Sequence, residues 1–266
     1  MTHPDSLADL PQSVTTDSPP KVRDIGFPDL MDSLTKGFAD FKAHPSHVVL
    51  CIMIYPVVIL VAARVGAGHD ILPLVWPLFS GIALISPLIA MGLYEMSRRR
   101  EKGHSVSVKD GFRVLRSPSL PAILILSLVM IAIFLAWLIA ALTIYQIIFS
   151  GSGAQSAEEF IAQVFTTEKG LLLVILGTAV GFIFAVLVLC ISVVSFPLLL
   201  DRRVSALTAA KTSFRVVLAN PQSMATWGLI IAVMLFLGFL PAFVGLAVVI
   251  PLLGHSTWHL YRKVVE

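Results

Sequence analysis

Residues 120–149 read LPAILILSLVMIAIFLAWLIAALTIYQIIF, an apolar run that contains no charged residue. A bilayer core about 30 Å thick is crossed by roughly 20 residues of helix, each rising about 1.5 Å. A helix satisfies all of its backbone hydrogen bonds internally, which is what a segment surrounded by lipid requires. This run therefore predicts a transmembrane helix that is long enough to cross with a tilt.

The whole chain has the composition of a membrane protein. Of its 266 residues, 57% are apolar and only 13% are charged, and the mean hydropathy is +0.89. A soluble domain carries about 25% charged residues. The pI near 9.0 does not indicate nucleic-acid binding, because the cations lie in short loops between apolar runs and form no compact basic domain.

Further apolar runs predict five more spans, at 47–66, 71–97, 171–200, 224–240 and 243–261. The last two belong to one apolar block, which we expect to break at Leu240-Pro241-Ala242, where Gly238 and Gly245 flank the break. A re-entrant hairpin in this block remains an open alternative to two full spans. The two cysteines, Cys51 and Cys190, lie inside apolar runs and predict no disulfide framework.

The distribution of lysine and arginine predicts the orientation. Of the 19 such residues, all except Arg64 and Lys169 fall in segments that are cytoplasmic if both termini are cytoplasmic, as the positive-inside rule requires. The polar stretch 1–27 predicts a disordered cytoplasmic tail without a signal peptide. Residues 28–266 then form one six-span domain in the inner membrane.

Each pair of spans follows a short amphipathic segment that ends at a proline. These elbow helices are expected at 29–45, 107–118 and 206–221, where Phe38, Phe112 and Phe214 occupy equivalent places. The second span of each pair carries Pro-Leu near its cytoplasmic end, at Pro87, Pro197 and Pro251, where we expect kinks. The pattern predicts an all-α protein built of three repeats, at about 28–104, 105–203 and 204–266.

The elbow helices are expected to lie on the cytoplasmic leaflet, with apolar faces in the acyl region and cations among anionic headgroups. The expected headgroup contacts are Lys109, Arg113, Arg116, Lys211 and Arg215. The first three are expected to contribute most, because no acidic residue lies in their stripe.

The elbow–proline pattern, the stretch NPQSMATWG at 220–228 and the closing VVIPLLGHSTWHLYRK at 248–263 resemble a known family. It is the bacterial family called domain of unknown function 2189, and the resemblance covers about residues 25–264. The resemblance implies a multi-span inner-membrane protein of unestablished function. Some relatives carry a label that connects them with cytochrome c oxidase subunit I.

The histidines argue against a haem site. Apart from His47 at the end of the first span, only His255 and His259 lie in a predicted span, and a single helix cannot place imidazoles on both faces of one haem. The two histidines are four residues apart and could bind one metal ion together. They are weak candidates, because no third ligand is evident. Beside Trp258 and Tyr261, they are better interpreted as interfacial anchors, so we expect no cofactor and no metal.

Other chemistry is equally sparse. No charge lies deep in a span, and Glu95 and Asp201 are expected to pair with neighbouring arginines at the cytoplasmic interface. The acidic outer loop at 151–169 predicts a short surface helix; a carboxylate pair for acid–base catalysis is the less favoured interpretation. No phosphate-binding glycine loop or nucleophile elbow occurs, so we expect no enzyme.

Small residues at helical spacing predict where the two longest spans pack. One stripe comprises Ala132, Ala136 and Ala140, and the other comprises Gly177, Gly181 and Ala185. Such stripes let helix backbones approach closely within lipid.

Two functions follow from these features. The favoured one is a non-catalytic scaffold or accessory subunit that binds anionic lipid and another membrane protein. The alternative is a carrier or channel for an apolar or lipid-like solute. A large polar-lined cavity would favour transport, whereas a tightly packed bundle with an exposed face of small residues would favour a protein partner.

Overall fold

The computed structural model describes residues 20–43, 72–149, 157–240 and 244–266, so the predicted span at 47–66 lies outside the described residues. In chain order the helices are α1 (Phe27–Ala43), α3 (Leu72–Ile89), α4 (Met91–Glu101), the 3-10 helix η2 (Val108–Arg116), α5 (Leu120–Phe149), α6 (Ala157–Thr166), α7 (Glu168–Ser192), α8 (Ser195–Asp201), α9 (Ala206–Ala219), α10 (Pro221–Phe239) and α11 (Leu246–Val264). This part of the chain is all-helical apart from connections and one bridge between Val22 and Val265.

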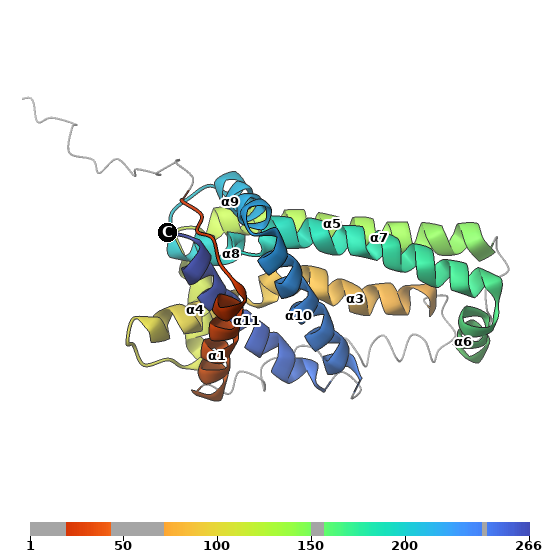
Figure 1. Ribbon diagram of the computed structural model, residues 1–266, viewed down its shortest axis with the longest axis horizontal. Coiled ribbons are helices and arrows are strands. Elements are labelled where there is room, and N and C mark those ends of the chain that lie inside the picture. Colours follow the sequence, from red (N-terminus) through yellow and green to blue (C-terminus); the bar gives the residue numbers. More distant parts are fainter. Residues whose placement is uncertain (1–19, 44–71, 150–156, 241–243) are drawn as a thin grey trace, which may run out of the picture.

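The long helices α5 and α7 lie side by side and, with α3, form one elongated end of the molecule (Figure 1). Within the described residues, three helical stretches are long and apolar enough to cross a membrane: Leu120–Phe149, Glu168–Asp201 and Pro221–Phe239. The first two coincide with the spans predicted at 120–149 and 171–200. Helix α6, which matches the predicted surface helix of the outer loop, lies at the end opposite the described termini (Figure 1).

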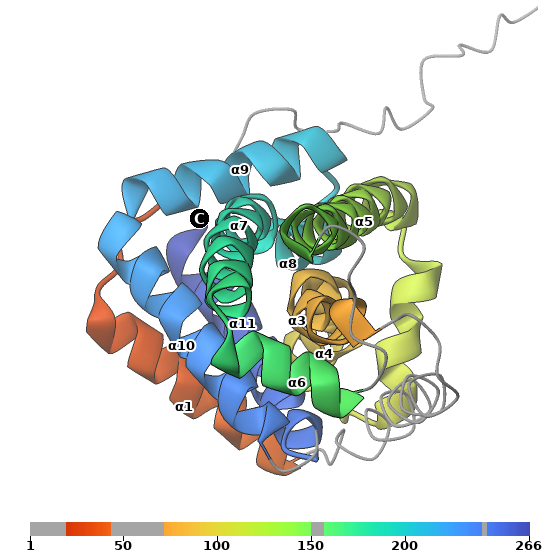
Figure 2. The ribbon, with the colours of Figure 1, turned by 90° about the vertical axis from the view of Figure 1, so that its right-hand side faces the viewer.

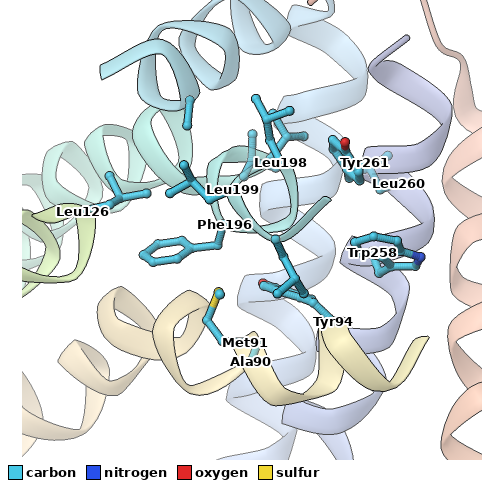
Figure 3. Packing of buried hydrophobic residues seen from close by; sticks show 14 of the residues in the cluster. Ala90, Met91, Tyr94, Leu126, Phe196, Leu198, Leu199, Trp258, Leu260 and Tyr261 are labelled. Atoms are coloured by element: carbon cyan, nitrogen blue, oxygen red, sulfur yellow. The ribbon is translucent and has the colours of Figure 1, made fainter. Parts of the chain in front are cut away.

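The main core lies at the other end, where α4, α8 and α11 each pack against the other two. Figure 3 shows Tyr94 from α4, Phe196 and Leu199 from α8, and Trp258 and Tyr261 from α11 around one packed centre. All five side chains are nearly or completely buried. Full burial of large apolar side chains stabilises each by about 1.5–3 kcal/mol, so this junction is the firmest part of the molecule.

The predicted prolines lie in the helices that return to this core. Helices α3 and α4 are separated only at Ala90, shortly after Pro87, and α7 and α8 are separated at Val193 and Val194, just before Pro197. A proline ring lacks the N–H donor and clashes with the carbonyl four residues earlier, which for Pro197 is the carbonyl of Val193. Helix α11 continues through Pro251 without interruption.

Helices α1, η2 and α9 occupy the segments that were predicted as elbow helices, and they run across the long axis. In Figure 2, which looks along α5 and α7, α9 lies along the top, α1 along the lower left, and the yellow η2 segment along the right. They form three sides around the bundle.

The elbow helices turn their apolar side away from the protein. Phe38, Phe112 and Phe214 are 45%, 61% and 49% exposed. The opposite faces pack inward and are mostly small or polar, with one large apolar residue on each: Leu30, Ser33, Gly37 and Asp40 on α1, and Thr208, Ala209, Thr212, Ser213 and Val216 on α9. An apolar face directed away from the protein is what a helix at a lipid interface requires.

The predicted break in the last apolar block is confirmed, since α10 ends at Phe239 and α11 begins at Leu246. The two helices run obliquely to α5 and α7, and α10 ends well short of α6 (Figure 1). The close approach of Gly238 and Gly245 makes the hairpin tight, because a Cβ on Gly245 would lie 2.8 Å from the Cα of Gly238.

The prediction of a disordered tail over residues 1–27 is wrong at its C-terminal end, because residues 20–26 pack against the rest of the protein. The side chain of Asn220 accepts a hydrogen bond from the backbone N–H of Ile25 at 2.8 Å and donates to the carbonyl of Arg23 at 3.1 Å. The bridge between Val22 and Val265 joins this segment to the C-terminus. Polar composition predicted disorder, but tertiary hydrogen bonds with Asn220 order these residues.

Candidate functional site

The most concentrated polar chemistry in the described residues surrounds Asp40. One carboxylate oxygen of Asp40 accepts from Arg100 at 2.6 Å, and the other lies 2.5 Å from Ser97 Oγ and 2.9 Å from His259 Nε2. Ser97 Oγ also lies 2.7 Å from Nδ1 of His255. This polar clamp, comprising Asp40, Ser97, Arg100, His255 and His259, joins α1, α4 and α11.

Small residues bring the three helices close enough for the clamp to form. On α1, Gly37 lies against Ser256 of α11, and a Cβ at position 37 would lie 2.7 Å from the Cα of Ser256. On α11, Gly254 faces Leu93 of α4. Because the backbones approach this closely, short side chains such as Asp40 and Ser97 reach across the helix interfaces.

The arrangement of the clamp is that of a structural contact between helices and differs from a catalytic triad. In a Ser-His-Asp triad the histidine lies between serine and aspartate, so that it can take the serine proton. In the clamp, Ser97 lies between Asp40 and His255 and donates its hydroxyl proton to the carboxylate. Asp40, Ser97 and His255 are at most 5% exposed, so a substrate has no access to the hydroxyl.

The clamp keeps Asp40 ionised. Burial raises the pKa of this carboxyl, but the hydrogen bonds from His259 and Ser97 and the nearby histidine charges outweigh burial, so its pKa lies below the ordinary value of 3.8. A buried carboxylate with charge-assisted bonds to three side chains holds its partners more firmly than exposed ion pairs do.

The two histidine candidates therefore lie in this clamp, and the predicted interfacial anchoring is wrong. His255 is fully buried, and so are its neighbours Trp258 and Tyr261. Trp258 donates its indole N–H to Glu101 at 3.0 Å, and Tyr261 donates its hydroxyl to Asp201 at 2.9 Å. Tertiary packing buries these aromatic side chains in the core, away from lipid. Their position in the sequence, near the end of a span, could not show this.

No group of three or more potential ligands that could hold a metal ion occurs within residues 20–43, 72–149, 157–240 and 244–266. Nδ1 of His255 faces Ser97, and Nε2 of His259 faces Asp40. The clamp was not predicted from the sequence. The spacing of Ser33, Gly37 and Asp40, which forms a small-residue stripe along α1, was the available signal.

The predicted pairing with a neighbouring arginine is confirmed for Glu95, but Asp201 pairs with a distant arginine. Glu95 pairs with Arg98 at 2.7 Å, and Asp201 pairs with Arg262 at 3.4 Å. The partner of Asp201 comes from α11, far along the chain, so that this pair also ties α8 to α11.

The predicted headgroup contacts all lie on exposed positions of the elbow helices: Lys109, Arg113 and Arg116 on η2, and Lys211 and Arg215 on α9. The expectation that η2 has no acid in its stripe is wrong. Asp110 lies 3.5 Å from Arg113 and 3.6 Å from Arg99. The backbone amide of Ser107 donates to Asp110 and lowers the pKa of its carboxyl, so Asp110 is charged and offsets these cations.

The predicted packing of α5 on α7 holds for one of the two stripes. Gly181 faces α5, but its neighbour is Trp137, whose ring would lie 3.1 Å from a Cβ on Gly181. Ala132 and Ala136 are exposed, and Ala140 is half-buried, so the alanine stripe faces away from α7. The large Trp137, whose indole N–H donates to the carbonyl of Pro77 at 3.0 Å, takes the interface position instead.

The remaining members of the glycine stripe contribute less. A Cβ on Gly177 would meet nothing within 4 Å of the described atoms, and Ala185 is exposed.

Replacing Gly181 by leucine is expected to lower the stability of the protein in detergent by about 2 kcal/mol, because the added side chain must displace Trp137. The measurement is the midpoint of thermal unfolding. The control is Leu172→Ala, at a position 46% exposed, which should change the midpoint little; equal losses in both variants would show that Gly181 has no special role.

Residues 75–201 match the family model described as a predicted integral membrane protein, DUF2189. Over these residues the chain is similar to that family. The match confirms the resemblance drawn from the sequence within residues 75–201, which contain most of α3 and all of α4, η2, α5, α6, α7 and α8. No curated protein and no solved structure matches the chain.

Proposed function

We propose that this protein is a non-catalytic scaffold or accessory subunit of a bacterial inner-membrane complex. The observation that carries the proposal is the combination of a closed core with an exposed small-residue face on α5. The core supplies a rigid base, and α5 and α7 extend from it with most of their apolar surface uncovered.

The closed core weighs against the alternative of a carrier or channel. A solute pathway between the repeats would run along the axis where α4, α8 and α11 meet. Tyr94, Phe196, Trp258 and Tyr261 fill this axis (Figure 3), and each is at most 2% exposed. Opening a path would require these aromatic side chains to leave a well-packed core, at a cost of several kcal/mol.

The exposed face favours a protein partner. Ala132 and Ala136 lie one helical turn apart on the outside of α5. Within lipid, helices associate through close packing of small residues, since no hydrophobic force drives them together. Leu128 and Ile139, which lie at helical spacing from the two alanines on the same side of α5, are 65% and 66% exposed, so a partner helix would approach between these larger side chains.

The proposal includes three repeats with both termini in the cytoplasm. Three observations support this: the elbow helices lie on three sides of the bundle, the returning helices meet at one centre, and the described termini lie opposite α6. For the last repeat we favour the re-entrant alternative, because α10 and α11 run obliquely and α10 ends short of α6 (Figure 1). A re-entrant hairpin leaves the C-terminus cytoplasmic.

The partner interface is tested by Ala136→Leu. Purification in mild detergent followed by quantitative mass spectrometry should show a membrane protein at constant ratio with the wild type. We expect Ala136→Leu to reduce that ratio at least fivefold, because a bulky side chain prevents close helix approach.

The matched control is Ala179→Leu, the same substitution at an exposed position of α7 outside the alanine stripe. It should leave the ratio unchanged. A wild-type protein that purifies without a stoichiometric partner, and that moves lipid between vesicles after reconstitution, would contradict the proposal and support the carrier.

A further inference from the structure

Hydrogen bonds from the residues at the break between α7 and α8 fix the position of α9 along the long axis of the molecule. The backbone N–H of Val194, freed where α7 ends, donates to Ser213 Oγ at 3.4 Å, and Ser195 Oγ donates to the carbonyl of Ala209 at 3.0 Å. These bonds join the inward face of α9 to the end of a long apolar stretch. The helix therefore lies crosswise where that stretch meets the charged end of the protein (Figure 2).

The outward face of α9 is apolar. Leu207, Phe214 and Leu218 are 63%, 49% and 64% exposed, and they recur at helical spacing. Three large apolar side chains on one exposed face are costly in water but suit the acyl boundary of a bilayer.

The cations beside this face are free of acidic neighbours. Helix α9 contains no aspartate or glutamate, and Lys211 and Arg215 make no ion pair with any residue that the structure describes. On η2, Lys109 and Arg116 also make no ion pair with a described residue, but the charge of Asp110, which pairs with Arg113, lies among them. On α1, Lys36 pairs with Asp32 at 2.8 Å. Helix α9 thus has cations available for an external anion.

We propose that α9 is the principal binding element for anionic phospholipid on this protein. Lys211 and Arg215 bind the headgroup phosphate, while Leu207, Phe214 and Leu218 enter the acyl region. The proposal does not depend on the scaffold function, and it moves the strongest lipid contact from η2, where the sequence placed it, to α9.

Native mass spectrometry of the purified full chain, with phosphatidylglycerol and phosphatidylcholine added in equal amounts, tests the proposal. The wild type should retain phosphatidylglycerol preferentially. Each cation near an anionic surface contributes roughly fivefold, equivalent to about 1 kcal/mol, so Lys211→Gln with Arg215→Gln should reduce the preference roughly tenfold or more. The exchange Lys211→Arg with Arg215→Lys should retain it.

The matched control is Lys109→Gln with Arg113→Gln, which removes the same charge from η2 and should reduce the preference about fivefold or less, because Asp110 already offsets it. Equal losses in the two double variants, or an unchanged preference in the α9 variant, would overturn the proposal. Only protein with a cytoplasmic C-terminal reporter is compared, which removes misinserted chains. If the double variant fails to insert, the single variants give the same comparison, each with about a fivefold loss expected.

Discussion

Replacing Gly37 by alanine is expected to detach α1 from α11 and to lower the free energy of unfolding by about 3 kcal/mol. Alanine alone would favour a helix by up to about 1 kcal/mol over glycine. At this position the new Cβ would lie 2.5 Å from the backbone nitrogen and 2.7 Å from the Cα of Ser256, and backbone atoms cannot rotate away. The clash therefore outweighs the gain in helix propensity. The measurement is the thermal unfolding midpoint in detergent.

The control is Gly177→Ala, which makes the same chemical change in a helix where a Cβ meets nothing within 4 Å of the described atoms. This variant should be neutral or more stable by up to about 1 kcal/mol. Similar midpoints for the two variants would show that α1 does not rest on Ser256. A loss confined to Gly37→Ala would show that close backbone contact sets the position of α1.

Replacing Asp40 by asparagine is expected to cost about 3 kcal/mol, because the partly buried Arg100 loses its ion-pair partner and Ser97 and His259 lose the carboxylate that they contact. The control is Asp32→Asn on the same helix. Asp32 pairs with Lys36 and Lys263, but its side chain is 42% exposed, so its loss should cost less than about 1 kcal/mol.

The contribution of Asp40 should also depend on pH with a definite sign. Its pKa in the folded protein lies below the ordinary value of 3.8, so its stabilising effect is complete above that value and is lost as pH falls through the lower folded pKa. The gap in unfolding midpoint between wild type and Asp40→Asn should therefore be constant above about pH 5 and shrink below about pH 4. A gap that widened on acidification would contradict the clamp.

Local sequence patterns determined the elements of this protein. The uncharged runs at 120–149 and 171–200 could only be long helices, because lipid leaves a backbone no other way to satisfy its hydrogen bonds. The elbow helices, the surface helix α6 and the break before Leu246 were likewise predicted, since amphipathic spacing, proline and glycine act within a few residues.

Tertiary structure alone decided which face of each helix meets which neighbour. Trp258 and Tyr261 have the sequence of an interfacial anchor but lie in the core, and Trp137 rather than Ala136 faces Gly181. Asp40 meets Ser97, His255 and His259 only because Gly37 lets α1 approach α11. A stripe of residues specifies which face of a helix packs, but it does not specify the neighbouring helix. That neighbour depends on contacts between segments far apart in the chain, such as Asp40 and His259, which are more than 200 residues apart.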